Sequence, residues 1–459
     1  MRNTRLKSGS TRRTAAPDGR SGGLYLAIWR WHFFAGLFTL PFLALLAVTG
    51  SLYLFKDEIN DWRYRDLLLV AHTDGANLDP SVIVAAAVQA KGGRPTAYSP
   101  PAAPGRSARV TVQCADDSSR NVYVDPGSGQ VLGELAAGEF GNLPLMDFVR
   151  RLHSLAIIGW PGNRLIEIVA GWAIILAGTG VYLWWPRGRQ GGVLTIRRKS
   201  GKRTFWRDLH AVTGVCAAAL IVFMALTGLP WSGVWGEGVK ALMHRTGLGY
   251  PDGFWFPVAK SALPAPKLQA PVPWSFEKLP VPSSLARIGQ ALDIDAAVLL
   301  FGEAGMAPGY TVTFPQGPEG VWSASVMPSK VDGIRRLHFD QYTGEVLLDM
   351  RYADLGAPAR AIEWGISVHT GQEFGRTNQV LMLLVCFALL AMSVSAVHMW
   401  LRRRPSGSLG APRVPDGHGA ARGMLAIIVL AGVVFPLVGL SIITFIAIDA
   451  LLPRQRQST

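Results

Sequence analysis

The chain has 459 residues, of which 49% are apolar and only 17% charged, and its formal net charge is +14. The apolar residues come in long uninterrupted blocks, which is unusual for a soluble protein and indicates a membrane protein. The excess of Lys and Arg does not indicate nucleic-acid binding, because these residues gather at the ends of the apolar blocks and in the segments between them. We therefore expect the lipid bilayer as a partner and no nucleic acid.

Five apolar blocks exceed the roughly 20 residues that a helix needs to cross the hydrocarbon layer. The first block is too long for the apolar part of a signal peptide and is expected to remain as an anchor. In chain order the sequence predicts a basic arm at 1–23, a first span at 24–55, an external domain at 56–164, a second span at 165–185, a basic loop at 186–208, a third span at 209–231, a second external domain at 232–379, a fourth span at 380–400, a loop at 401–423 and a fifth span at 424–452.

The distribution of positive charge predicts the orientation. Lys and Arg are concentrated in the arm 1–23, in the loop 186–208 and at the start of the loop 401–423. Segments rich in these residues stay on the cytoplasmic side of a membrane. The N-terminus is therefore expected in the cytoplasm, and the two long segments between spans are expected outside.

The first and third spans repeat one motif. In each, a glycine follows a histidine after four residues, and a Thr-Gly pair ends eighteen residues after the histidine. The two copies are His32, Gly36 and Thr49-Gly50, and His210, Gly214 and Thr227-Gly228. Histidines are rare inside membrane spans, so agreement at two spacings indicates an internal repeat.

The repeat continues into the long segments. Alternating apolar residues lead to Asp125 in one half and to Asp340 in the other, and a glycine follows four positions later, which predicts two β-hairpins. A histidine then precedes the next span, His153 in the first half and His369 in the second. Each half thus reads as helix, small α+β domain, histidine and helix, and the halves are parallel repeats because both enter from the same side.

These features resemble the PepSY-associated transmembrane family, whose members are often described as iron-regulated or iron-uptake membrane proteins. The resemblance covers residues 24 to 404 and rests on the Trp31-His32 motif, the two hairpins, which look like PepSY modules, and the stretch from Trp364 to Gly371 before a span. With the repeat, the sequence predicts a mainly α-helical polytopic membrane protein with two external α+β PepSY-like domains, built as two parallel repeats plus an extra C-terminal span that lies outside the resemblance. The resemblance implies a place in the bacterial inner membrane. It also implies a haem-containing reductase that passes electrons to ferric siderophores or similar ferric chelates on the periplasmic side.

Five histidines lie in or beside the spans and are candidate axial ligands of haem iron: His32, His210 and His398 toward the cytoplasm, and His153 and His369 toward the outside. An ionisable side chain in a span is costly and indicates function. Imidazole suits iron, and haem b needs only axial ligands from the protein, so we expect two haems b, one near each face. The alternative is that these histidines only cap helices or hydrogen-bond across packed interfaces.

The external pair follows from the repeat, because His153 and His369 occupy equivalent positions. Toward the cytoplasm three histidines compete for two axial positions, and the sequence leaves that choice open. His32 and His210 are repeat mates, whereas His398 aligns with Tyr182. The histidine left over is a candidate contact for a haem propionate or a quinone head group.

Five arginines near the external histidines are candidate contacts for a haem propionate or an anionic ferric chelate: Arg150, Arg151, Arg335, Arg336 and Arg376. Contact with lipid phosphate is the competing interpretation. The chain has no nucleotide-binding motif, so the electron donor is expected to be a membrane quinol or a cytoplasmic reductase.

Two other functions compete with the reductase. In the first, a non-redox protein uses its PepSY-like modules to bind a peptide or a protease. In the second, a transporter uses the parallel repeats, which is less favoured because the spans lack charged pairs apart from Glu167.

Overall fold

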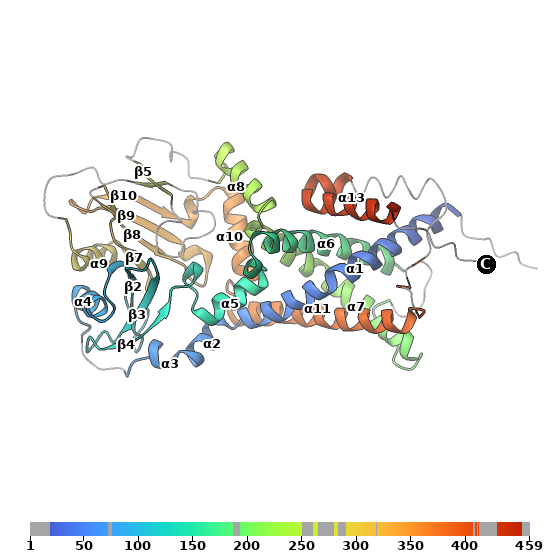
Figure 1. Cartoon of the computed structure of the whole chain (residues 1–459), viewed down its shortest axis with the longest axis horizontal. Helices are drawn as coiled ribbons and strands as arrows, with labels where there is room; N and C mark the ends of the chain where they lie inside the picture. Colours follow the sequence, from blue (N-terminus) through green and yellow to red (C-terminus); the bar gives the residue numbers. More distant parts are fainter. Residues whose placement is uncertain are drawn as a thin grey trace, which may run out of the picture. The chain divides into compact units, whose positions relative to one another are not determined.

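The computed structural model describes residues 19–451 apart from 72–75, 187–192, 250–259, 265–279, 283–290, 318, 407–408, 411 and 413–428. Four helices in this part of the chain are long and apolar enough to cross a membrane (Figure 1). They are α1 (Gly19–Tyr53), α6 (Trp160–Trp184), α7 (Lys202–Gly228) and α11 (Gly375–Arg403). The first four predicted spans are thus confirmed as helices, and the chain is a multi-pass membrane protein.

The segment predicted as a fifth span, 424–452, lies partly outside the described residues. Its described part is helical at 429–434 and again in α13 (Pro436–Leu451), a helix of 16 residues. The two helical stretches are interrupted at Phe435, because Pro436 has no backbone N–H and cannot continue the preceding helix. The apolar pattern therefore predicted one uninterrupted helix where the described residues show a break.

Between α1 and α6, and again between α7 and α11, the described residues form two series of elements that share a common order from α4 to α5 and from α9 to α10. The first series is α2 (Lys56–Arg63), α3 (Arg65–Leu68), α4 (Pro80–Lys91), β1 (Arg94–Ser99), β2 (Ala108–Gln113), β3 (Ser119–Val124), β4 (Val131–Ala136) and α5 (Pro144–His153). The second is α8 (Trp235–Thr246), β5 (Lys260–Pro264), β6 (Pro280–Pro282), α9 (Ile294–Glu303), β7 (Thr311–Thr313), β8 (Val321–Val326), β9 (Arg335–Asp340), β10 (Val346–Arg351) and α10 (Ala357–His369). In both, one helix, four strands and a second helix follow each other, which is the predicted repeat.

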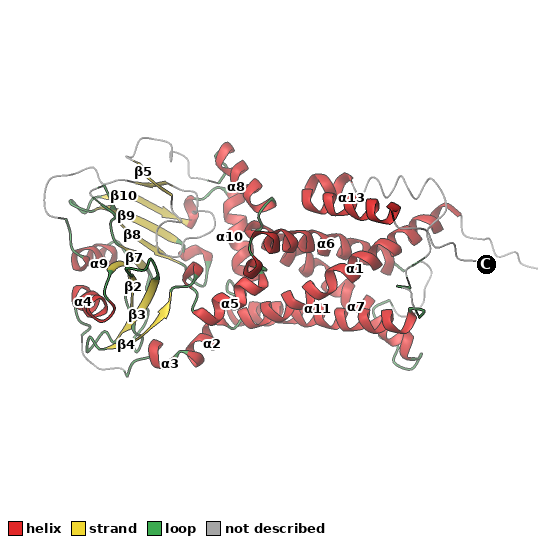
Figure 2. Ribbon diagram, viewed as in Figure 1, coloured by secondary structure: helices red, strands yellow, loops and turns green. Residues whose placement is uncertain are grey.

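The eight main strands form a single antiparallel sheet in the order β10-β9-β8-β7-β1-β2-β3-β4 (Figure 2). The sequence predicted two separate small domains. Instead, β1 and β7, each at the edge of its own four-stranded half, pair with each other, so that Ala97 lies opposite Thr313 and Tyr98 opposite Val312. Pairing joins the halves because an unpaired edge strand leaves a row of N–H and C=O groups without partners.

Both predicted hairpins are confirmed. β3 pairs with β4 and β9 with β10. In each turn the aspartate carboxylate accepts hydrogen bonds from backbone N–H groups, of Gly127 for Asp125 and of Tyr342 and Thr343 for Asp340. Gly129 and Gly344, four residues after these aspartates, have φ of +73° and +71°, values that residues other than glycine rarely adopt.

Helices α4 and α9 cover one face of the sheet and share its hydrophobic core (Figure 1). Alternate strand residues point into this core, among them Val110, Val122, Val312 and Phe339, and Phe301 of α9 packs against them. The two halves of the repeat therefore contribute to one core.

The chain divides into two compact units. One contains residues Met1–Pro41, Gly171–Ala218 and Met392–Thr459, and the other Phe42–Ala170 and Ala219–Ala391. The first, called here the bundle unit, holds one part of each long helix together with α13. The second, called here the sheet unit, holds the remaining parts of the long helices, the sheet and α5 and α10.

Replacing Phe301 with alanine tests whether the halves share one core. Phe301 is fully buried, and truncating such a side chain costs about 3–5 kcal/mol. We expect a markedly lower melting temperature in detergent, measured by tryptophan fluorescence. Leu299 on the same helix is 63% exposed, so Leu299→Ala should change the melting temperature little. Equal losses in both variants would contradict the shared core.

Candidate functional site

His153 and His369 are brought together in the sheet unit. Each is the last residue of a short helix, α5 or α10, that begins with a proline in its first turn. The centres of their rings are 6.5 Å apart and the ring planes cross at 83°. Two residues that are 216 positions apart in the sequence thus form a facing pair, as the repeat predicted.

Threonines of the repeated Thr-Gly motif hold these two rings. The hydroxyl of Thr49 donates its single proton to the carbonyl oxygen of Leu45 at 2.7 Å, and its oxygen lies 2.9 Å from Nδ1 of His153. Since that proton is already used, Nδ1 of His153 must carry a hydrogen and donate it to the threonine. The other ring nitrogen, Nε2, is therefore left with its lone pair.

His369 has the same environment in the second half. Thr227 donates to the carbonyl oxygen of Phe223 at 2.8 Å and accepts from Nδ1 of His369 at 2.9 Å. The glycine after each threonine lies beside the ring: a Cβ at Gly50 or Gly228 would be 3.4 or 3.6 Å from Cε1 of the histidine, which is ordinary van der Waals contact. Metal-binding histidines usually have this arrangement, in which one nitrogen is fixed by an acceptor and the other is free to bind.

The bundle unit repeats the arrangement with other residues. His32 of α1 donates from Nδ1 to Thr179 of α6 at 2.9 Å, and Thr179 in turn donates to the carbonyl oxygen of Ile175 at 2.8 Å. A Cβ at Gly180, the next residue, would lie 3.3 Å from Cε1 of His32. Thr179-Gly180 is thus a third Thr-Gly pair with the same role.

His210 of α7 is held by α11. Its Nδ1 lies 3.2 Å from the carbonyl oxygen of Met392 and 3.2 Å from Oγ of Ser395. A carbonyl only accepts, so Nδ1 is again the donor and Nε2 keeps its lone pair. His210 and His32 are close enough to interact electrostatically.

Thr179 and Ser395 are absent from the sites predicted from the sequence. The signal that would have found them is the repeat offset, because the 216 residues that separate His153 from His369 also separate Thr179 from Ser395.

His398 differs from the other four. Its ring stacks on Trp206, with ring centres 4.5 Å apart and an angle of 28° between the planes. Within the described part of the chain its ring makes no hydrogen bond that would select one tautomer. Of the three candidates toward the cytoplasm, the structure gives only His32 and His210 matching environments.

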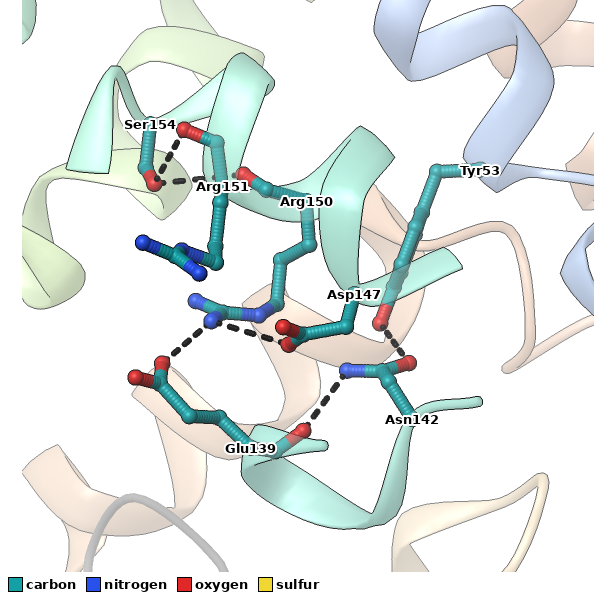
Figure 3. Close-up of polar contacts among 7 residues, drawn as sticks. All are labelled: Tyr53, Glu139, Asn142, Asp147, Arg150, Arg151 and Ser154. Carbon is teal, nitrogen blue, oxygen red and sulfur yellow. Dashed lines mark hydrogen bonds and ion pairs between the residues drawn. The ribbon is translucent and has the colours of Figure 1, made fainter. Parts of the chain in front are cut away.

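Three of the five candidate arginines pair with carboxylates of the same chain. Arg150 lies between Glu139 and Asp147, as Figure 3 shows. Arg335 forms a two-pronged pair with Asp349, at 2.7 and 2.8 Å. Arg376 pairs with Glu58 and donates to Gln379 at 2.8 Å.

The other two arginines have no carboxylate partner in the described part of the chain. Arg151 is exposed, and in Figure 3 no interaction reaches its guanidinium group. Arg336 is buried in the sheet, where its Nε lies 3.1 Å from Nε2 of His338. Within the described part of the chain, no hydrogen bond or ion pair joins these arginines to His153 or His369, and their role as contacts of a propionate or a chelate stays a prediction.

Glu167, the acidic residue noted in the second span, has a structural role. Its carboxylate accepts hydrogen bonds from the backbone N–H groups of Val234 and Trp235 at 2.8 and 3.0 Å. It therefore caps the start of α8, where a negative charge is favourable.

The facing histidines predict an acid-sensitive stability. Burial lowers the pKa of His153 to about 4 and that of His369 to about 3, whereas in the unfolded chain both titrate near 6.5. As the pH falls from about 6.5 toward these values, the unfolded chain binds protons that the folded chain does not, so stability is lost. The melting temperature of cofactor-free protein should fall between pH 7 and pH 5, and less so in the double variant His153→Gln/His369→Gln. The same slope in both proteins would contradict this assignment.

Comparison with known proteins assigns the chain to a family. The family model described as "PepSY-associated TM region" matches residues 29–403, which include all four long helices apart from the start of α1, the sheet and the five histidines. No curated protein matches the chain. Because the match covers most of the sequence, the chain belongs to the PepSY-associated transmembrane family.

Proposed function

We propose that this protein is a haem b electron carrier of the bacterial inner membrane that reduces ferric siderophores or similar ferric chelates on the periplasmic side. The observation that carries the proposal is the shared environment of four histidines. In each, Nδ1 donates to a fixed acceptor, and Nε2 keeps a lone pair. Histidines with only a structural role would not need to share one tautomer in both the sheet unit and the bundle unit.

The spacing of the external pair fits axial ligation. His153 and His369 would hold the haem through Nε2, and two imidazoles that bind one metal ion have ring centres roughly 6 to 7 Å apart. The centres of His153 and His369 are 6.5 Å apart. The pair supplies two ligands, which suits a macrocycle that brings its own four nitrogens.

Haem b, when bound, supplies an iron that carries one electron at a time. The protein's own contribution is to fix the ligands. Thr49 and Thr227 orient the rings of His153 and His369, and a hydrogen bond from Nδ1–H makes Nε2 a more basic ligand. Gly50 and Gly228 keep side chains away from the ring edges.

For the second haem we propose His32 and His210. They are repeat mates, each is anchored through Nδ1 by a residue of the following long helix, and they lie within electrostatic reach of one another. His398, stacked on Trp206, is left for a propionate or for the head group of a quinol donor. A cytoplasmic reductase is the other candidate donor.

The first test is a reduced-minus-oxidised optical spectrum with a pyridine haemochrome assay on detergent-purified protein from haem-replete cells. We expect two haems b per chain. His153→Ala and His369→Ala should each remove one, and His32→Ala and His210→Ala the other, because a bis-histidine site needs both ligands. His398→Ala is the matched control and should keep both.

A colourless wild-type protein would overturn the proposal. It would favour the non-redox alternative, in which the sheet binds a peptide or protease. Retention of both haems in His32→Ala together with loss in His398→Ala would instead reassign the second pair.

The threonine anchors can be tested separately from ligation. Thr227→Val removes the acceptor of the His369 Nδ1–H, which weakens the ligand's electron donation, so the midpoint potential of one haem should rise. Thr227→Ser should keep the wild-type potential. Thr246→Val is a matched control, since Thr246 makes the same bond to a carbonyl four residues earlier, Leu242, and is exposed. An unchanged potential in Thr227→Val, by spectroelectrochemical titration, would contradict the assigned anchor.

A further inference from the structure

On the face of the sheet opposite α4 and α9, the side chains of β9, β8, β7, β1, β2 and β3 are mostly polar, whereas Met350 and Leu348 of β10 continue the same face in an apolar cluster. Reading the strand register across β9, β8, β7, β1, β2 and β3 gives two rows of side chains on this face. One row contains Arg336, Ser325, Thr311, Ser99, Arg109 and Tyr123, and the other contains His338, Ser323, Thr313, Ala97, Thr111 and Asn121. These two rows are called here the polar layer.

The polar layer is largely buried. Arg336 and Thr313 are each 2% exposed and His338 is 1% exposed. Burying hydroxyl and guanidinium groups costs free energy unless every one of them finds a partner. The opposite face carries apolar side chains, and on this face Met350 of β10, which lies opposite Arg336, is also part of an apolar cluster.

Arg336 is a buried cation that has no counterion among the described residues. Its Nε donates to Nε2 of His338, and the Nδ1 of His338 lies 2.7 Å from the hydroxyl of Ser323. His338 accepts at Nε2 and is therefore neutral. Nη1 of Arg336 is buried without a hydrogen-bond partner, and no carboxylate in the described residues pairs with this guanidinium.

A second cation lies on the same face. Nη2 of Arg109 is 3.0 Å from Oγ of Ser99 and 3.5 Å from Oγ1 of Thr311, so the guanidinium of this β2 residue reaches over β1 to β7. It too pairs with no carboxylate of the described chain. On β7, two residues from Thr311, the hydroxyl oxygen of Thr313 is also buried without a partner.

The spacing of these groups suits a ligand with more than one negative group. Neighbouring strands are about 4.8 Å apart, so two strand steps from β7 to β9 span roughly 10 Å. One carboxylate is too small to reach from the Arg109 head group to Arg336. Arg109 and Ser99 are half-buried rather than buried, which leaves that end of the layer accessible to solvent.

We propose that the polar layer binds an anion that carries several carboxylates, with Arg336 and Arg109 as its two cationic contacts and Thr313 as a hydrogen-bonding contact. Guanidinium groups bind carboxylates in a two-pronged geometry, which supplies the partner that Arg336 lacks. The inference deepens the proposed function. It rests on that function in one respect, which is that the anion is the carboxylate-rich chelate of the ferric substrate.

The test is isothermal titration calorimetry of the full-length protein in detergent with citrate and with gallium(III) citrate. Gallium(III) resembles ferric iron in charge and ligand preference but is not reduced, so binding is measured without electron transfer. We expect saturable binding of gallium citrate that weakens at least about tenfold in Arg336→Lys and in Arg109→Gln, because each variant loses a two-pronged charged contact.

Thr313→Val separates binding from folding. The Thr313 hydroxyl has no partner, so its removal should leave the melting temperature unchanged or higher and still weaken binding. Arg351→Gln is the control, since Arg351 on β10 is exposed and lies outside the polar layer. It should bind gallium citrate like the wild type.

No saturable binding of either probe, or equal binding by wild type, Arg336→Lys and Arg109→Gln, would overturn the proposal. The outcome is independent of the haem assay. Binding without haem would leave an anion-binding membrane protein, whereas haem without binding would leave the electron carrier and remove only the polar layer as its substrate site.

Discussion

The proton of a threonine hydroxyl determines which ring nitrogen is left to bind a ligand in His32, His153 and His369. A threonine inside a helix can donate to the carbonyl four residues earlier, and Thr49, Thr179 and Thr227 all do so. Each then has only its oxygen lone pairs left for a neighbouring ring, which must arrive as a donor. The helix backbone thus selects the tautomer of a histidine on another element, and the tautomer decides which nitrogen is left for a ligand.

A glycine follows each of these threonines, and at Gly180 a Cβ would lie 3.3 Å from the ring of His32, closer than ordinary van der Waals contact. The residue after the anchor lies beside the anchored ring, where Gly50, Gly180 and Gly228 place no side chain. Tight helix packing alone would also favour small residues in spans, so glycines by themselves do not distinguish the two causes. The pairing of threonine with glycine does, since packing does not require a hydroxyl that accepts from imidazole.

The sequence predicted the parts of this structure that depend on pattern and length. The four long helices, the two hairpins and the equivalence of His153 and His369 followed from apolar blocks, turn residues and repeat spacing. It did not predict that β1 and β7 would pair, because edge-to-edge pairing of two halves leaves no signal in either half. It did not predict Thr179 and Ser395 either, because these equivalent positions carry different dipeptides, Thr179-Gly180 in one half and Ser395-Ala396 in the other. It did not predict the carboxylate partners of Arg335 and Arg376, because Asp349 and Glu58 come from another strand and another helix.

The two halves have kept their symmetry at the histidines and lost it on the sheet. His153 and His369 match in residue, anchor and position, whereas on β3 and β9 Asn121 and Tyr123 stand where the other half has Arg336 and His338. Under the proposed ligation, His153 and His369 would hold the same cofactor, so both halves would need the same residue at this position. An anion of irregular shape does not require the same residue at equivalent positions, so the second half can supply the buried cation Arg336 and the first half the half-buried cation Arg109. The symmetry therefore depends on the kind of ligand that each region is proposed to hold. The histidine pair, proposed to hold one cofactor between the halves, is symmetric, and the polar layer, proposed to hold an anion, is not.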